Sequence, residues 1–425
     1  MNKLRLLLLT LCWLMPFISP VQAKTDDAQQ LFNSRQPALF QIRLIENNAG
    51  NKSAIGSGFQ ISPDGIIATN YHVISGYVQH PDNYHLEFMD NEGNTGPLKV
   101  LDIDVINDLA LVKRETDNSD FFPITKVQPA QGEQVFSLGN PHDLGMIVVP
   151  GTYNGLKEHS FYQRVHFTGS VNPGMSGGPA INTAGEVVGI NVSTAGNQIA
   201  FLVPHFKLTA LVEQFEQRTP DAPSDFSARI QSQLQSNQQR LMEQILNADW
   251  QPRPMGNIKV PDKISPFIPC WGQSNADKKN ASFFSVVTNC SMSEQIYLEN
   301  HFRSGNVAIQ YQWIKSDELN RFRFYNVYEQ QISRAGADNM ANQENVTEFS
   351  CMQDVVSHQV NDIKTKSVLC TRAYKKYEGL FDVMYISASI DKAQQGLISH
   401  FTLAGIEQSL ALKFTQKFME SVEWK

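Results

Sequence analysis

Short apolar runs separated by turn-forming residues fill the sequence from residue 30 to residue 204, and this pattern narrows the choice of folds. The runs, for example 38–45, 55–61 and 109–112, are four to eight residues long. Gly, Asn, Asp and Pro stand between them, as in the turn Pro63-Asp64-Gly65. Short strands joined by tight turns are typical of antiparallel barrels and sandwiches. We therefore expect an all-β barrel or sandwich in this part of the chain.

The composition changes after this part, which indicates further units. Residues 217–225 are polar and contain two prolines, so we interpret them as a linker. Apolar residues then recur every three to four positions from Phe226 to Ile245, and Asp225 stands where a helix N-cap is expected. We predict a first domain over 30–216, a linker with an amphipathic helix over 217–254, and a cysteine-containing α+β domain of unassigned family over 255–425.

The last unit mixes two kinds of pattern. Apolar runs at 283–287, 307–313, 322–328 and 381–390 predict strands. Near the end of the chain, apolar residues at helical spacing form one stripe, which predicts a terminal helix: Leu403, Ile406, Leu410, Phe414 and Phe418. Strands followed by a helix give the α+β class.

The N-terminus has the pattern of a secretory signal peptide. Lys3 and Arg5 precede an apolar stretch over 6–18, and Val21-Gln22-Ala23 has the small-x-small form of a cleavage site. The alternative, a membrane anchor, would need an apolar span of ~20 residues. We expect a signal peptide over 1–23, export with the bacterial periplasm as the favoured compartment, and no stable membrane span after cleavage.

Four cysteines follow the signal peptide, and all lie in the last third of the chain: Cys270, Cys290, Cys351 and Cys370. In an oxidising compartment they allow three pairings, of which we favour the two local ones, Cys270 with Cys290 and Cys351 with Cys370. The alternative is a zinc site. Zinc ligands usually come as closely spaced pairs, which these cysteines do not form.

Charge and histidine placement exclude several ligands. Lys and Arg number 35 against 42 Asp and Glu, a net charge of −7, and no basic run is present. Phosphate backbones bind concentrated positive charge, so we expect no nucleic-acid partner. Most histidines stand in polar segments without metal-ligand spacing, so we expect exposed loop positions, no metal and no cofactor: His80, His85, His142, His159 and His166.

The segment Asn172-Pro-Gly-Met-Ser-Gly-Gly-Pro179 is the strongest chemical signal. A nucleophilic serine needs an exposed hydroxyl on a tight turn and backbone N–H groups aimed at the oxyanion. Gly174 can adopt the backbone angles of such a turn, which makes Ser176 a candidate nucleophile. A Gly-rich hairpin is the alternative. Serine also needs a base, and His72 and Asp108 occur in that order before it, each at the end or start of an apolar run.

These stretches together resemble the HtrA/Deg branch of the trypsin-fold serine proteases, over about two fifths of the chain. The resemblance implies a chymotrypsin/trypsin-like double β-barrel of six strands each, with the active site in the cleft between the barrels. It implies His72 as general base, Asp108 as the group that orients it, and Ser176 as nucleophile, with the N–H groups of Gly174 and Ser176 as oxyanion hole. The matching stretches are GSGF at 56–59, TNYHV at 69–73, NDLALVK at 107–113, LGNP at 138–141, NPGMSGGP at 172–179 and VVGIN at 187–191.

Several positions depart from digestive trypsins or from the branch itself. Met175 stands where trypsins have an Asp that pairs with a newly cut N-terminus, so that route of activation is excluded. Ser170 replaces the acidic pocket base, which predicts cleavage after uncharged, small or medium apolar residues. We expect Ser170, Asn191 and Val192 to bind substrate, with the pocket walls formed by residues 192–194 and 199–201. No Gly-rich carboxylate-binding loop of a PDZ domain follows residue 204.

Two functions compete at this stage. The first is an exported serine endopeptidase that hydrolyses polypeptides through a Ser-His-Asp triad, in envelope protein quality control. The second is a catalytically weak or inactive protease-fold protein that binds polypeptides or acts as a chaperone. Copies of HtrA/Deg proteins often associate, so a homo-oligomer is among the expectations.

Overall fold

The computed structural model of the protein describes residues 25–115, 120–218, 225–278, 280–358 and 363–424. The predicted signal peptide over 1–23 lies outside the described residues. Of the described helices, none combines the length and the apolar character that a membrane crossing requires.

Antiparallel strands from the first part of the chain form a barrel-like sheet in the order β5-β4-β1-β2-β3-β7-β6. Only Leu98 separates β5 from β6, so the two edge strands of this sheet are consecutive along the chain. Counted as one bent strand they give six strands, as the resemblance implies. Pro97 ends β5 because proline cannot donate to a ladder. The strands are β1 (Leu39–Glu46), β2 (Lys52–Gln60), β3 (Ile66–Thr69), β4 (Tyr84–Met89), β5 (Thr95–Pro97), β6 (Lys99–Asp104) and β7 (Leu109–Lys113).

The next six strands close into a second barrel in the order β10-β13-β12-β11-β8-β9. Helix α2 (Tyr71–Gln79) follows β3 of the first barrel, and helices α1 (Thr25–Arg35) and α3 (His205–Glu216) flank the two barrels in sequence. The barrel strands are β8 (Gln134–Gly139), β9 (Ile147–Leu156), β10 (Val165–Thr168), β11 (Pro179–Ile181), β12 (Val187–Thr194) and β13 (Ala200–Pro204).

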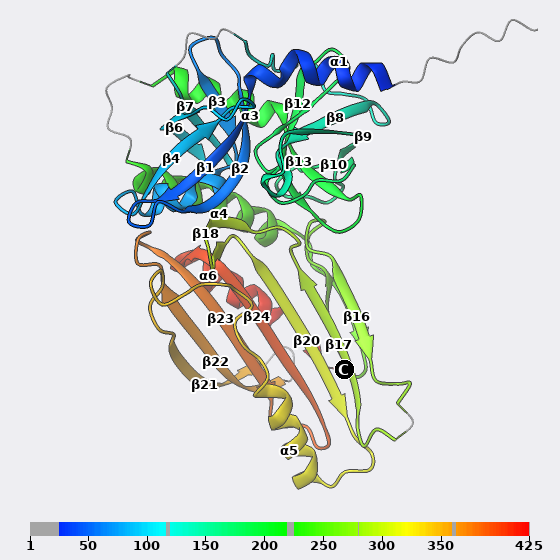
Figure 1. Ribbon diagram of the computed structural model, residues 1–425. Helices are drawn as coiled ribbons and strands as arrows, with labels where there is room; N and C mark the ends of the chain where they lie inside the picture. Colours follow the sequence, from blue (N-terminus) through cyan, green and yellow to red (C-terminus); the bar gives the residue numbers. More distant parts are fainter. Residues whose placement is uncertain (1–24, 116–119, 219–224, 279, 359–362, 425) are drawn as a thin grey trace, which may run out of the picture.

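The C-terminal region is built on a long antiparallel sheet in the order β16-β17-β20-β24-β23-β22-β21 (Figure 1). Disulfides Cys270–Cys290 and Cys351–Cys370 join each edge strand to its neighbour. The sheet strands are β16 (Cys270–Ser274), β17 (Phe284–Ser291), β20 (Val307–Lys315), β21 (Ser350–His358), β22 (Ile363–Ala373), β23 (Leu380–Ser389) and β24 (Gln395–Glu407). Two smaller sheets consist of β14 (Gln251–Met255), β15 (Ile258–Lys263) and β25 (Glu423–Trp424), and of the hairpin β18 (Ile296–Glu299) and β19 (Phe302–Ser304).

Two sequence predictions in this region are wrong. The run 322–328, predicted as a strand, lies in helix α5 (Arg321–Ile332), where the side chain of Asn320 caps the N-terminus and Phe324 and Tyr328 are buried on one face. The stripe that begins at Leu403 does not form one helix. Residues up to Glu407 belong to β24, which is buried between β20 and β23, and helix α6 (Gln408–Glu420) carries only the second half of the stripe.

Helix α4 (Phe226–Asn247) lies between the barrels and the C-terminal sheet (Figure 1). Asp225 caps it as predicted, by accepting a hydrogen bond from the N–H of Ala228. Its apolar face belongs to a single cluster of buried side chains that runs from Ile42 in β1 to Phe401 in β24. Two cationic side chains, Arg218 after α3 and Arg229 on α4, pair with Asp102 of β6, each at 2.6 Å.

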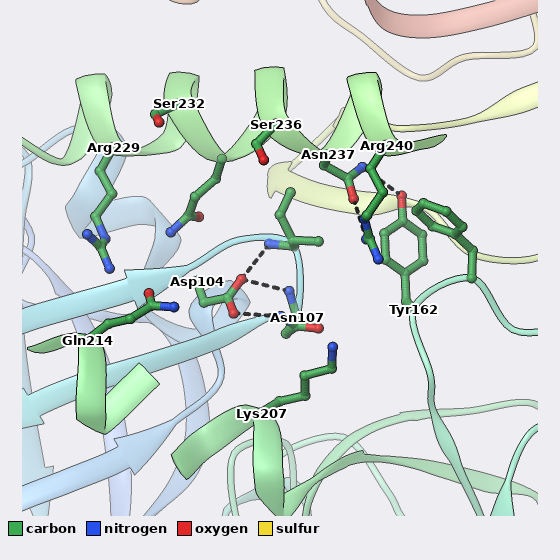
Figure 2. A pocket seen from close by; sticks show the side chains of 13 residues that line it. Asp104, Asn107, Tyr162, Lys207, Gln214, Arg229, Ser232, Ser236, Asn237 and Arg240 are labelled. Carbon is green, nitrogen blue, oxygen red and sulfur yellow. Dashed lines mark hydrogen bonds between the residues drawn. The ribbon is translucent and has the colours of Figure 1, made fainter. Parts of the chain in front are cut away.

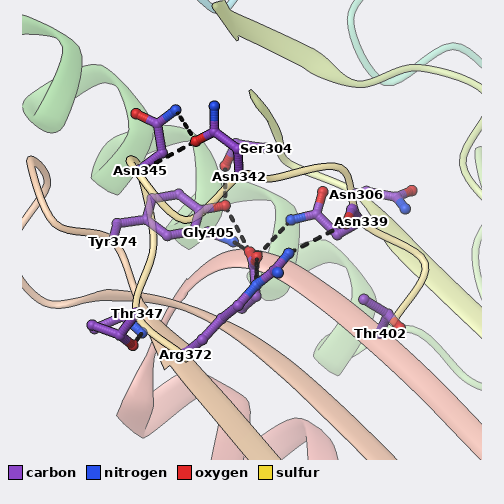
Figure 3. A network of polar contacts seen from close by, with 12 residues as sticks. Ser304, Asn306, Asn339, Asn342, Asn345, Thr347, Arg372, Tyr374, Thr402 and Gly405 are labelled. Atoms are coloured by element: carbon purple, nitrogen blue, oxygen red, sulfur yellow. Dashed lines mark hydrogen bonds and ion pairs between the residues drawn. The ribbon is translucent and has the colours of Figure 1, made fainter. Parts of the chain in front are cut away.

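A buried carboxylate organises the end of the C-terminal sheet that lies nearest to the barrels (Figure 3). Asp382 of β23 accepts hydrogen bonds from Tyr374, Asn339 and the backbone of Gly405, and it pairs with Arg372 at 2.8 Å. Burial raises the pKa of Asp382, and the Arg372 charge opposes that shift. This network ties the loop around residue 339 to three strands of the sheet.

Candidate active site

Ser176 lies on a tight turn between β10 and β11 that only glycine can build. Gly174 has a φ of +96°, and a Cβ there would lie 2.3 Å from the carbonyl oxygen of Asn140. Gly177 has a φ of +84°, and a Cβ there would lie 2.3 Å from the carbonyl oxygen of Ser57. Both positions combine a left-handed backbone with contact against other backbone, so a larger residue would break the turn.

The backbone N–H groups of this turn divide into two sets. Met175 donates to Asn172, Gly177 donates to Asn191, and Gly178 donates back to Met175, at 3.0, 2.9 and 3.0 Å. The N–H groups of Gly174 and Ser176 have no partner among the described residues. Buried backbone N–H groups are almost always paired, so two free ones on one turn indicate a place for an anionic oxygen.

The orientation of the Gly174 peptide fits this arrangement. The carbonyl oxygen of Pro173 accepts a hydrogen bond from the N–H of His142 at 2.9 Å. In a trans peptide the N–H points away from the carbonyl of the same unit. The N–H of Gly174 therefore faces away from the His142 segment and is not used by it.

His72 and Asp108 form a tightly coupled pair. The imidazole Nδ1 lies 2.6 Å from Asp108 Oδ2, and the N–H of His72 donates to Asp108 Oδ1 at 2.8 Å. A carboxylate accepts only, so Nδ1 carries the proton and Nε2 is left as the basic nitrogen. The His72 side chain is 27% exposed and that of Asp108 12%, so the pair is mostly buried and the imidazole is the more exposed of the two groups.

The backbone around Asp108 is held in an unusual shape. Asp108 has a φ of 61°, in the left-handed region that Asp tolerates better than most residues. Its carbonyl accepts from the Asn70 side chain at 2.8 Å, and Arg164 donates to the carbonyl of Asn107 at 3.0 Å. Burial lowers the pKa of Arg164, and the negative charge of Asp108 opposes that shift.

The serine turn rests on β2 of the other barrel. The N–H of Ser57 donates to the carbonyl of Ser176 at 2.7 Å. A Cβ on Gly56 would touch both the Ser176 carbonyl and the side chain of Val73, the neighbour of His72. The structure therefore brings the three predicted catalytic residues to one place. The hydroxyl of Ser176 makes no hydrogen bond with another described residue. In unliganded enzymes the hydrogen bond between a catalytic serine and its histidine is often long.

The side chain of Ser57 is a part of the site to which sequence reasoning assigned no role. Its hydroxyl donates to the carbonyl of Gly174 at 2.8 Å and accepts from the N–H of Asn140 at 2.9 Å. It thereby fixes the loop that presents the free N–H groups. The only available signal was its place in the GSGF stretch, which by itself says nothing of a hydroxyl bound to Gly174.

The three residues predicted to bind substrate lie in different surroundings. Ser170 is exposed, and Val192 is partly buried against the apolar cluster that the two barrels share. Asn191 differs from the prediction because its side chain is fully buried. Its amide donates to the carbonyls of Leu138 and Met175 and accepts from Ser137, so it supports the serine turn from beneath.

A polar cavity of about 630 Å³ is lined in part by Asp104 and Asn107, which precede Asp108 in the chain (Figure 2). Asn107 forms part of its wall, together with Lys207 of α3 and Arg240 of α4. Burial lowers the pKa of Lys207, and the nearby positive charge of Arg240 adds to that shift. Asp104 lies at the same wall and accepts from the backbone and side chain of Asn107.

The part of the chain that contains this site is similar to known proteins. Residues 56–190 match the family described as trypsin-like peptidase domain. Serine protease HTRA1B of Danio rerio is 30% identical over 197 residues, which are 43% of this chain and 40% of that protein. A probable periplasmic serine endoprotease, DegP-like, of Marinomonas sp. is 32% identical over 180 residues, 39% of this chain and 36% of that protein. The crystal structure of the serine endoprotease from Yersinia pestis has 28% identity, covers 44% of this chain and 66% of its own, and gives a TM-score of 0.40.

The chain therefore contains a trypsin-like peptidase domain. Over that domain it is similar to the HtrA/DegP serine proteases, which confirms the resemblance inferred from the sequence motifs. The chain spans about 40% of the length of the curated relatives described above.

Proposed function

We propose that the protein is a serine endopeptidase that uses Ser176, His72 and Asp108 as its catalytic triad. The observation that carries the proposal is the pair of unpartnered N–H groups at Gly174 and Ser176. They accompany a histidine whose Nδ1 lies 2.6 Å from a carboxylate. A turn that served only structure would pair its N–H groups, and the contact at Nδ1 leaves His72 Nε2 as the basic nitrogen.

The chemistry follows from these positions. Ser176 Oγ attacks the scissile carbonyl carbon while its proton moves to His72 Nε2, and the Asp108 carboxylate stabilises the resulting imidazolium. The carbonyl oxygen becomes an oxyanion that accepts from the N–H groups of Gly174 and Ser176. His72 then gives the proton to the leaving amine, which leaves an ester on Ser176. Water hydrolyses this ester by the same steps, with His72 again taking and returning the proton.

The setting of the reaction is part of the same proposal. We extend to this chain the periplasmic location printed in the name of the Marinomonas relative, because residues 1–23 have the pattern of a signal peptide. Unfolded or damaged envelope proteins are the proposed substrates. We expect cleavage after uncharged residues, because Ser170 provides no carboxylate that could pair with a Lys or Arg of the substrate. The proposal also includes the domain boundaries at 30–216, 217–254 and 255–425, and a homo-oligomer as the assembly.

A second candidate, a protein that keeps the fold and binds polypeptides with little hydrolysis, has one observation in its favour. Within the described residues the Ser176 hydroxyl is not hydrogen-bonded to His72, so the nucleophile is not yet coupled to its base.

Labelling with a fluorophosphonate tests the proposal because the probe reports an activated serine without knowledge of the substrate. We expect the purified chain to be labelled and Ser176→Ala to remain unlabelled. Mass spectrometry of the adduct then locates the phosphonate on Ser176. A folded parent that is not labelled, together with binding of an unfolded polypeptide such as reduced casein, would favour the second candidate.

A further inference from the structure

The β18–β19 hairpin of the C-terminal region packs directly on α2, the helix that carries the candidate general base. At the start of α2, the hydroxyl of Tyr71 donates to the carbonyl of Leu298 at 2.8 Å in a buried contact. At its end, His80 pairs with Glu299 at 2.9 Å, so His80 is not the free loop histidine that the sequence suggested. The hairpin thus holds both ends of the helix.

Between these two contacts, the hairpin places the aromatic ring of Tyr297 next to the imidazole of His72. The ring centroids of Tyr297 and His72 lie 5.9 Å apart, with the rings inclined at 65°. Arg303 of β19 stacks over Tyr297, with its guanidinium carbon 4.0 Å from the ring centroid, and donates to the carbonyl of Glu299 at 2.8 Å. A stacked arginine and a hairpin backbone leave the tyrosine ring little freedom to move.

The same segment also reaches the second barrel. Glu294, just before β18, accepts from the hydroxyl of Ser160 at 2.7 Å and pairs with Lys157 at 3.3 Å. Ser293 accepts from Lys157 at 2.7 Å. Because the segment from 293 to 303 contacts both barrels, its position relative to the cleft is fixed from two sides.

We propose that Tyr297 is a positioning residue for His72, supplied to the active site by the C-terminal region; this inference rests on the proposed function. Asp108 holds the ring of His72 through one hydrogen bond at Nδ1, and a change of rotamer of this partly exposed side chain would break that bond. Tyr297 lies against the ring and opposes that change. A base held by packing as well as by its hydrogen bond stays aimed at Ser176.

The test compares three variants of the full chain on a peptide substrate. Tyr297→Leu removes the ring, and we expect kcat to fall about tenfold, or ~1.4 kcal/mol in activation free energy, while KM changes by less than ~2-fold. Tyr297→Phe keeps the ring, and we expect it to restore kcat to within ~2-fold of the parent. Tyr325→Leu is the matched control, because Tyr325 of α5 is also partly buried and faces an arginine, Arg321 at 5.7 Å, away from the barrels.

The labelling rate with a fluorophosphonate separates positioning from other roles. We expect it to fall in Tyr297→Leu by the same factor as kcat, because the probe also needs the base. If KM rises and labelling is unchanged, Tyr297 lines the substrate path and the inference is wrong. If activity increases, the hairpin obstructs the cleft, and the inference is equally wrong. An unlabelled parent would instead overturn the proposed function, and thermal unfolding of each variant identifies a loss of fold.

Discussion

At the scale of single residues, the Asp108 carboxylate contributes both geometry and tautomer. It holds the backbone and the ring of His72 at once, at 2.8 and 2.6 Å. Asp108→Asn keeps the size of the side chain but can offer an N–H to Nδ1, which would leave the proton of His72 on Nε2. We expect kcat for peptide cleavage to fall roughly 10⁴-fold, with the fold intact by circular dichroism.

Asp104→Asn is the matched control for this substitution. This substitution removes the same charge from the same loop. Asp104 accepts hydrogen bonds from backbone N–H groups there, and it makes no hydrogen bond with His72. We expect less than ~3-fold change in kcat, because the partly buried hydrogen bonds of Asp104 stabilise the loop by ~1 kcal/mol and do not involve the base. Equal losses in both variants would mean that Asp108 acts only through the loop.

Whether a residue of the site could be predicted from the sequence depends on how far away in the sequence its contacts lie. His72, Asp108 and Ser176 could be predicted because each stands in a short stretch whose residue types suit its task. Tyr297 could not, since the hairpin meets α2 across a separation such as the 227 positions between Tyr71 and Leu298, and a contact of that kind leaves no local pattern. The role of Asn191 was mistaken because neighbouring strand positions face opposite sides, and the sequence did not say which side faced the cleft.

At the scale of secondary-structure elements, the two disulfides protect the edges of the C-terminal sheet. Cys270 pairs with Cys290 between β16 and β17, and Cys351 pairs with Cys370 between β21 and β22, each directly across the ladder. Replacing the second pair with serine should destabilise the protein by about 3 kcal/mol, because each bond closes a loop of some twenty residues. Urea unfolding gives the size of the effect, and hydrogen exchange should show faster exchange in β21.

The Cys270→Ser, Cys290→Ser variant is the reciprocal control, which should speed exchange in β16 and leave β21 protected. Faster exchange at both edges in either variant would show that the bonds act on the whole sheet.

Among the secondary-structure elements, the strands of the barrels were predictable from short apolar runs, whereas α5 and the start of α6 were not. Aromatic-rich runs occur in helices and in strands. The cap at Asn320 favours a helix for α5, and the pairing of β24 with β20 and β23 keeps residues up to Glu407 in a strand.

At the scale of the whole molecule, the first barrel shares one buried apolar cluster with the C-terminal sheet through α4 and a second cluster with the other barrel. Separate folding units would each bury their own core. We therefore expect a single cooperative unfolding transition, although the sequence alone predicted a linker between 217 and 254. Tryptophan fluorescence reports only the C-terminal region, because every tryptophan beyond the signal peptide lies at position 250 or later. Hydrogen exchange in β12 reports the second barrel.

Leu234 of α4 tests this coupling, because it is 2% exposed and belongs to the shared cluster. Leu234→Ala should destabilise the protein by about 3 kcal/mol, through lost burial and the cavity that remains. Both probes should shift to the same lower urea midpoint, while Ser232→Ala, exposed on the same helix, should leave both midpoints in place. A shift in fluorescence alone would mean that the barrels fold without the C-terminal region. In that case the contact of Tyr297 with His72 would be a docking of two independent units, and the active site would depend on how often they are docked.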